Sequence, residues 1–394
     1  MREVTLVLCL PEGSVLGALP PFRVEVPWWP QVGPVVAAAR AAHGVETTIL
    51  RLLFAEPGRG MGGGQVTYLA EVASPPKAAL DPWSGTPTDD EPLRLSYARP
   101  GGYRDDLAWA DIELVNHGTP RTGPAEQVRT WNLSSMWRLP VEGSAAWLKV
   151  VPPFFAHESR VLAVLDPAVV PRLIAGAGPR ILIEEIPGAD QHGIGGAPLL
   201  TMVRLLVGLQ VEWMGRVDEL LALGLPDWRP EPLLVRAVDV VARTAAELDA
   251  GVLRRLDRLL EEFPRRCADV VSCGLPTTLV HGDFHRGNVR GTDDRLVLVD
   301  WGDSGIGHPL FDQTAFLEHL PDAERAAVTQ EWTRLWLASI PDSDPDRAAL
   351  LLRPVAALRQ AVIYRGFLDA IEPDERIYHA LDPADWLTRA AELA

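Results

Sequence analysis

The stretch His281-Gly-Asp-Phe-His-Arg-Gly-Asn288 is followed, after a run rich in β-branched residues, by Asp300-Trp-Gly-Asp303. Together the two segments place an acid, an amide and a second acid at the spacing that a phosphoryl-transfer site needs. In such a site the acid after His-Gly accepts the proton of a substrate hydroxyl, while the Asn and the second Asp hold magnesium against nucleotide phosphates. The pattern therefore predicts Asp283 as the catalytic base, with Asn288 and Asp300 as metal ligands.

Extended segments flank this loop and favour a site over a chance turn. Thr278-Leu-Val280 precedes it, and Arg295-Leu-Val-Leu-Val299 follows it as a predicted strand. Two strands would thus bracket the loop and bring Asp300 to its mouth. One alternative is a polar turn without a catalytic role. Another is a zinc site on His281 and His285, but no Cys or third ligand lies at a suitable spacing for it.

The loop resembles that of the aminoglycoside phosphotransferase and choline kinase family of small-molecule kinases, which reads His-Gly-Asp, four residues, Asn. The resemblance implies an α+β, protein-kinase-like bilobal fold with a β-rich small lobe and a mainly helical large lobe. It also implies magnesium-dependent transfer of the γ-phosphate of ATP or GTP to a hydroxyl of a small molecule. An aminoglycoside, an amino sugar, a choline-like alcohol or a related metabolite would be the acceptor. His281 is expected to brace the loop from inside.

A second sign comes from the basic residues, of which 37 are present but only Lys77 and Lys149 are lysine. Lys149 lies in a buried-strand pattern, and a helical run begins nearby at Glu158. A compact ammonium suits contact with the α- and β-phosphates better than a planar guanidinium does. A lysine held by a helix glutamate is the kinase arrangement, so Lys149 is predicted to bind phosphates and Glu158 to hold it. The alternative is a surface lysine on an edge strand.

The segment Arg180-Ile-Leu-Ile-Glu-Glu-Ile-Pro-Gly188 resembles the interlobe hinge of the family. By that resemblance the backbone of Glu184, Glu185 and Ile186 would bond the adenine edge. The candidate residues also follow one another along the chain as in the family. In order they are Lys149, Glu158, the hinge, Asp283, Asn288 and Asp300.

One segment departs from the kinase pattern. Kinases usually cover the triphosphate with a glycine-rich hairpin, but the equivalent residues 129–138 contain no glycine. Ser134 and Ser135 are the residues there that could donate hydrogen bonds to phosphate oxygens. The departure leaves nucleotide preference open.

The acceptor site has weaker candidates. Residues 302–312 resemble the family segment that anchors the catalytic core, so Asp312 is expected to bond backbone near the catalytic loop. Asp303 would hold a second metal or face the acceptor. Gln360 and Tyr364 lie on a predicted amphipathic helix that borders the acceptor in relatives, which makes them possible acceptor contacts.

The pattern of elements predicts three regions: an N-terminal α/β unit of unknown role at 1–115, a small lobe at 116–187 and a helical large lobe at 188–394. Residues 74–92 are rich in Pro, Asp, Gly and Thr and read as a loop. Strands are expected at 2–10, 22–26, 45–54 and 65–73. Helices are expected at 35–42, 105–115, 199–223, 232–247, 251–271, 322–337 and 346–371.

Composition narrows the partners of this 394-residue chain. A net charge of −16 argues against nucleic acid and anionic membranes, both of which need a basic patch, and would suit a cationic substrate. Three cysteines are too few and badly spaced for a disulfide framework, which fits a reducing cytoplasm. No uninterrupted apolar stretch reaches transmembrane length. The sequence carries no signal for the oligomeric state.

Two other functions share parts of the pattern. A nucleotide-binding pseudokinase that acts as a sensor or scaffold would explain the missing glycine-rich loop, although the three residues Asp283, Asn288 and Asp300 occur together. A protein kinase is disfavoured because the loop reads His-Gly-Asp and no Ala-Pro-Glu follows Asp300.

Overall fold

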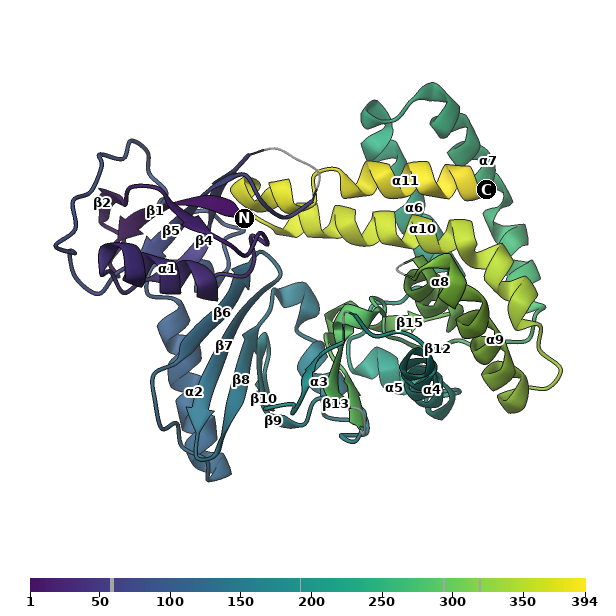
Figure 1. Ribbon diagram of the computed structural model, residues 1–394. Coiled ribbons are helices and arrows are strands. Elements are labelled where there is room, and N and C mark those ends of the chain that lie inside the picture. The colour runs from purple at the N-terminus through teal and green to yellow at the C-terminus, as the bar shows by residue number, and fades with distance from the viewer. Residues whose placement is uncertain (57–59, 192, 293–294, 319) are drawn as a thin grey trace. The chain divides into compact units, whose positions relative to one another are not determined.

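The computed structural model describes residues 1–394 except 57–59, 192, 293–294 and 319 (Figure 1). The chain forms two compact units. The first unit contains Met1–Ser159, Leu173–Glu185 and Leu368–Ala380, and the second contains Arg160–Arg172, Ile186–Phe367 and Leu381–Ala394. The structure thus has two units, each built from three segments of the chain, whereas the sequence predicts three continuous regions. The boundaries of those regions stay a prediction.

The first unit begins with a five-stranded sheet of order β2-β1-β5-β4, with β3 paired to β1. Its strands are β1 (Arg2–Cys9), β2 (Val15–Ala18), β3 (Phe22–Val24), β4 (Thr48–Ala55) and β5 (Gln65–Glu71). Helix α1 (Gly33–His43) buries Val35 and Ala39 in the same core as Leu6 and Leu8 of β1. We call this assembly the N-terminal sheet.

A second sheet in the first unit has the order β6-β7-β8-β10-β9 and is antiparallel throughout. Its strands are β6 (Glu126–Trp131), β7 (Ser134–Val141), β8 (Ser144–Val150), β9 (Leu173–Ala177) and β10 (Arg180–Glu184). Leu148 and Leu182 of this sheet pack against Ala110 and Leu114 of α2 (Tyr103–His117). A short helical stretch, η6 (Pro373–Tyr378), belongs to this unit although it follows α10 in the chain.

The second unit is mainly helical and carries the catalytic loop between short strands (Figure 1). Its helices are α4 (Ala197–Glu212), α5 (Val217–Ala222), α6 (Pro230–Thr244), α7 (Ala250–Val271), α8 (Leu310–Glu318), α9 (Asp322–Ser339), α10 (Pro345–Ala370) and α11 (Asp382–Leu393). Its strands are β11 (Ala189–Asp190), β12 (Thr278–Val280), β13 (Val289–Thr292), β14 (Arg295–Leu298) and β15 (Gly305–Gly307). Among the described residues, no helix combines the length and apolar character needed to cross a membrane.

Most predicted elements are present within a few residues of their expected ends, but two predictions were wrong or incomplete and three elements were missed. The helix expected over 199–223 is two helices, α4 and α5, because Gly215 between them is left-handed, with φ 75°. The helical run from Glu158 is short, since α3 spans only Glu158–Leu162. The sequence reading also missed β2, α8 and α11, whose patterns are short or broken by Pro.

Candidate active site

The catalytic loop begins where β12 ends, and its path depends on Gly282. This residue has φ 92°, and a Cβ there would lie 2.0 Å from the carbonyl oxygen of Asp303. The carboxylate of Asp312 accepts hydrogen bonds from the backbone N–H of His281 at 2.9 Å and of Gly282 at 2.8 Å. Burial raises the pKa of Asp312 to about 6. Asp312 therefore pins the loop backbone, as the sequence predicted.

His281 is fully buried and packs inward against Trp301, with ring centroids 4.6 Å apart. Its Nε2 lies 3.0 Å from the carbonyl oxygen of Val299, which can only accept, so Nε2 carries the proton. Burial lowers the pKa of His281 to about 4, and the ring is neutral near pH 7. The structure confirms His281 as a brace.

Arg359 also holds this loop, and the sequence reading missed it. Its side chain is buried in α10, where its guanidinium lies 3.4 Å from the carbonyl oxygens of Gly282 and Asp303. It also lies over the ring of Trp228, 5.0 Å from the centroid. A cation directly after the apolar run Val355–Leu358 was the available signal. A buried charge of this kind is expected to serve a defined partner.

Asp283 is held by two neighbours in the loop. Asn288 Nδ2 donates to Asp283 Oδ2 at 2.8 Å, and His285 Nε2 lies 3.4 Å from the same oxygen. Because His285 Nδ1 accepts from the Gly287 N–H, Nε2 is the nitrogen that bears a proton. Burial opposes ionisation of Asp283, but the hydrogen bond and charge of His285 outweigh it and keep the pKa of this carboxyl below its usual value. Asp283 is thus an oriented carboxylate that can accept a proton.

Asp300 follows β14 and is the one non-glycine residue with positive φ, 65°, in the part of the chain that the structure describes. Such a backbone conformation is sparsely populated and clusters at functional sites. The Val299 N–H donates to the Asn288 carbonyl at 2.9 Å, which ties this strand end to the loop. Burial and, more weakly, the charge of Asp300 act to raise the pKa of Asp283, against the larger effect of His285. The structure thus brings the three predicted residues together in the second unit.

The residues fit magnesium better than zinc. Magnesium typically takes one or two protein ligands and completes its shell with water and phosphate oxygens. Asn288 and Asp300 would supply one amide oxygen and one carboxylate. Among the described residues, no three His, Cys, Asp or Glu side chains form a metal-holding group. The zinc alternative on His281 and His285 finds no support.

Lys149 lies on β8 in the first unit, where it pairs with Ile181 of β10. Its ammonium contacts both carboxylate oxygens of Glu158 at 2.8 Å. The two side chains are 12% and 3% exposed, so this is a buried ion pair and Lys149 is not a surface lysine. The pairing has the kinase geometry predicted from the sequence, while the contact with phosphate stays a prediction.

The hinge residues lie at the point where the chain passes between the two units, since Glu185 ends one segment of the first and Ile186 begins one of the second. Glu185 N donates to the Ala145 carbonyl at 3.1 Å, and its carboxylate accepts from Trp147 Nε1 at 2.9 Å. The Ile186 carbonyl accepts from Arg290 Nε at 3.2 Å. The adenine contact of Glu184, Glu185 and Ile186 stays a prediction.

Ser134 and Ser135 are both buried. Their hydroxyl oxygens accept from the indole N–H groups of Trp131 at 3.0 Å and Trp137 at 3.1 Å. A hydroxyl that accepts one bond still has its own proton to donate. Their phosphate contact stays a prediction.

The acceptor candidates lie in the second unit. Burial raises the pKa of Tyr364, and the charges of Asp382, Asp283 and Asp303 act in the same direction. The charge of Asp283 thus acts on Tyr364, whose ring lies 5.6 Å from that of Phe367. Gln360 is partly exposed on the same helix. Contact of Asp303, Gln360 and Tyr364 with an acceptor stays a prediction.

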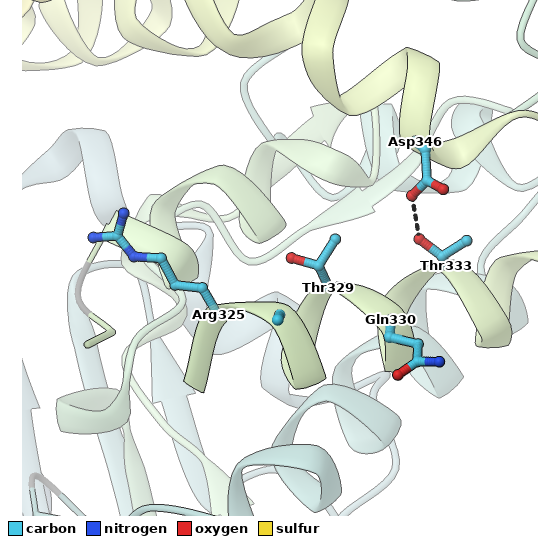
Figure 2. A pocket seen from close by; sticks show the side chains of 6 residues that line it. Arg325, Thr329, Gln330, Thr333 and Asp346 are labelled. Atoms are coloured by element: carbon cyan, nitrogen blue, oxygen red, sulfur yellow. Dashed lines mark hydrogen bonds between the residues drawn. The ribbon is translucent and has the colours of Figure 1, made fainter. Parts of the chain in front are cut away.

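An open hollow of about 460 Å³ lies along α9 and the start of α10 (Figure 2). It is lined by Arg325, Ala326, Thr329, Gln330, Thr333 and Asp346, and Thr333 Oγ1 donates to Asp346 Oδ1 at 2.6 Å. None of the residues predicted for catalysis, metal or nucleotide lines it. The hollow is therefore separate from the chemistry of the catalytic loop.

Comparison with known proteins identifies the family. A model of the phosphotransferase enzyme family (APH) matches residues 137–351, more than half of the 394 residues. The chain belongs to the phosphotransferase enzyme family. The match includes Lys149, Glu158 and the catalytic loop, and it confirms both the resemblance seen in the loop and the prediction of a small-molecule kinase. No curated protein sequence matches the chain.

Two solved structures show the fold of this phosphotransferase. A type I macrolide 2'-phosphotransferase is 18% identical with a TM-score of 0.51, and the match covers 71% of this chain and 96% of that one. A candidate aminoglycoside phosphotransferase from Ralstonia eutropha JMP134 is 19% identical, also with a TM-score of 0.51, covering 74% and 97%. At this identity the likeness confirms the kinase-like α+β fold.

Proposed function

We propose that the protein transfers the γ-phosphate of ATP or GTP to a hydroxyl group of a small molecule, with magnesium as cofactor. The observation that carries this proposal is the state of Asp283. Its carboxylate is partly exposed and is oriented by His285 and Asn288, its pKa is lowered, and the charge of Asp300 acts on it. A carboxylate of this kind accepts the hydroxyl proton as the acceptor oxygen attacks.

In the proposed reaction the acceptor oxygen forms a bond with the γ-phosphorus while the bond from that phosphorus to the β,γ-bridging oxygen breaks. Asp283 takes the hydroxyl proton, and a nucleoside diphosphate leaves. Lys149, held by Glu158, would contact the α- and β-phosphates. Magnesium, held by Asn288 and Asp300, would offset the negative charge of the phosphates.

The acceptor is proposed to be cationic. Asp303 follows the proposed metal ligand by three residues, and the chain carries a net charge of −16. Negative charge near the entering hydroxyl raises the local concentration of an amine-bearing substrate and disfavours an anionic one. Aminoglycosides, amino sugars and choline-like alcohols share these two features, a cationic nitrogen and a hydroxyl.

A screen of such alcohols with ATP or GTP and magnesium tests the proposal. Nucleoside diphosphate release is measured by a coupled assay, and phosphorylated product by mass spectrometry. Asp283→Asn is the negative control, and Asp105→Asn, an exposed acid on α2, is the matched control that should keep full activity. Tight binding of magnesium-nucleotide without transfer to any acceptor would instead favour the pseudokinase.

A further inference from the structure

The hairpin of β6 and β7 contains residues 129–138, which the sequence predicts to take the place of the glycine-rich hairpin of kinases, and most of the residues around its turn are buried. Thr130, Asn132, Ser134 and Ser135 are each at most 4% exposed. A flap that opens and closes has few buried contacts and an exposed tip. This hairpin is instead packed into the first unit and has the character of a fixed element.

The edge of the hairpin is covered by the N-terminal sheet. The Thr130 N–H donates to the Pro30 carbonyl at 3.0 Å. The side-chain amide of Gln127 makes two bonds with one residue of β4, donating to the Ile49 carbonyl at 2.7 Å and accepting from its N–H at 2.8 Å. These bonds satisfy edge groups of β4 and β6 that would otherwise face water. They tie the hairpin to residues far upstream in the chain.

The tip of the hairpin is held by η6. The rings of Trp131 and Tyr378 meet edge to face, with centroids 5.6 Å apart. Asn132 Nδ2 donates to the Glu375 carbonyl at 3.3 Å, and the Tyr97 hydroxyl donates to the Trp131 carbonyl at 2.8 Å. The contacts reach Trp131 at the end of β6 and Asn132 in the turn, and all of them lie within the first unit.

Buried polar and charged groups in turn fix residues 372–378 to the N-terminal sheet. The Leu52 N–H donates to Glu375 Oε1 at 3.3 Å. Arg51 of β4 lies 3.2 Å from Glu372, and these side chains are 1% and 3% exposed. Arg94 contacts the same glutamate at 2.9 Å. Hairpin, sheet and η6 therefore form one packed body.

We propose that the N-terminal sheet and residues 372–378 form a positioning element for the nucleotide, which holds the glycine-free hairpin in its binding position. This proposal rests on the proposed function. A hairpin that is already ordered loses little conformational freedom when a ligand binds, and this raises affinity without the close backbone approach that glycine permits. The N-terminal sheet and most of the hairpin lie outside the family match, which begins at residue 137.

The variant Tyr378→Ala tests the proposal because it removes the ring that packs on Trp131. Amide hydrogen exchange of residues 128–137 should accelerate at least tenfold. If the hairpin then occupies its binding position about 10–20% of the time, the calorimetric Kd for magnesium-ADP rises about fivefold to tenfold. Tyr378→Phe is the conservative control: the buried hydroxyl has no partner among the described residues, so exchange and Kd should match the parent.

A second control separates positioning from general destabilisation. Phe263→Ala removes a buried ring of α7 in the second unit, outside the proposed positioning element. It should lower the Tm as Tyr378→Ala does but leave hairpin exchange and Kd unchanged, at a temperature where both proteins are folded. Should Tyr378→Ala fail to fold, Gln127→Ala takes its place, since it removes only two hydrogen bonds from a half-buried side chain.

Two results for Tyr378→Ala would overturn this proposal and leave the proposed function intact. One is hairpin exchange that stays at the parent rate, and the other is faster exchange with an unchanged Kd. A rise in Kd that Phe263→Ala reproduces would also overturn it, because the effect would then follow stability. A parent protein that binds no magnesium-ADP would overturn the proposed function together with this one.

Discussion

Replacing Lys149 by methionine should destabilise the first unit as well as abolish activity. The ammonium lies 2.8 Å from both oxygens of a glutamate that is 3% exposed, and methionine has similar length but no charge. Removing one partner of a buried ion pair costs about 3–5 kcal/mol, because the remaining charge stays in a poorly solvated place. At about 2–4 °C per kcal/mol the Tm should fall by roughly 6–20 °C. The 12% exposure of Lys149 favours the lower end.

Thermal unfolding of the parent, Lys149→Met, Lys77→Met and a double variant measures this loss of stability. Lys77→Met, which changes the other, exposed lysine, should unfold within about 2 °C of the parent. The double variant Lys149→Met with Glu158→Gln should regain more than half of the lost stability, since no charge is then buried alone, yet it should stay inactive. Lys149→Arg should keep the charge but lose at least about tenfold in rate, because the wider head displaces the phosphates. A Tm of Lys149→Met equal to that of the parent would refute the buried-pair reasoning.

Asp283→Asn should abolish phosphoryl transfer and leave the Kd for magnesium-nucleotide within a few fold, because this acid acts on the acceptor. Steady-state rates measure the transfer and calorimetry measures the Kd. Full activity of the variant would remove Asp283 from the mechanism. Asp300→Ala should remove the magnesium dependence of nucleotide binding, since a carboxylate ligand is lost, and calorimetry that shows unchanged affinity with magnesium would contradict this assignment. Burial and the charge of Glu372 raise the pKa of Glu375 to about 8, so the folded state holds a proton that the unfolded state releases near pH 4.5. Stability should therefore fall as pH rises from about 4.5 to 8 and level off above. In Glu375→Gln this part of the slope should disappear from urea-unfolding curves, and a slope equal to the parent's would refute the assignment.

The sequence predicted the catalytic loop well because its chemistry is local. His281, Asp283 and Asn288 lie within eight residues, and the strand before Asp300 is marked by β-branched side chains. Lys149 and Glu158 were found for a similar reason, because nine residues separate them. Such short spacings leave few geometries open.

Contacts over long sequence distances were beyond reach. Arg359 contacts the carbonyl oxygen of Gly282, 77 residues away; the apolar residues before it indicate that the cation is buried, but not what it contacts. The hydrogen bond between η6 and the hairpin connects Asn132 with Glu375, which lies 243 residues further along the chain. Nothing in either segment marks its partner, because the bond uses a backbone carbonyl that every residue possesses. The break between α4 and α5 was missed because the apolar periodicity continues through it.

The buried arginine of β4 has a consequence for how the chain folds. Its aspartate partner, Asp374, lies 323 residues downstream, and Glu372 is nearly as distant. The ribosome synthesises about 5–20 residues per second, so Asp374 is made about 15–65 seconds after Arg51. During this interval Arg51 has no acidic partner from this segment. The early sheet would then expose a cation and an uncovered aromatic face, a state that chaperones recognise. A contact of such long range also slows folding of the isolated chain, since its loop must close before it contributes any stability.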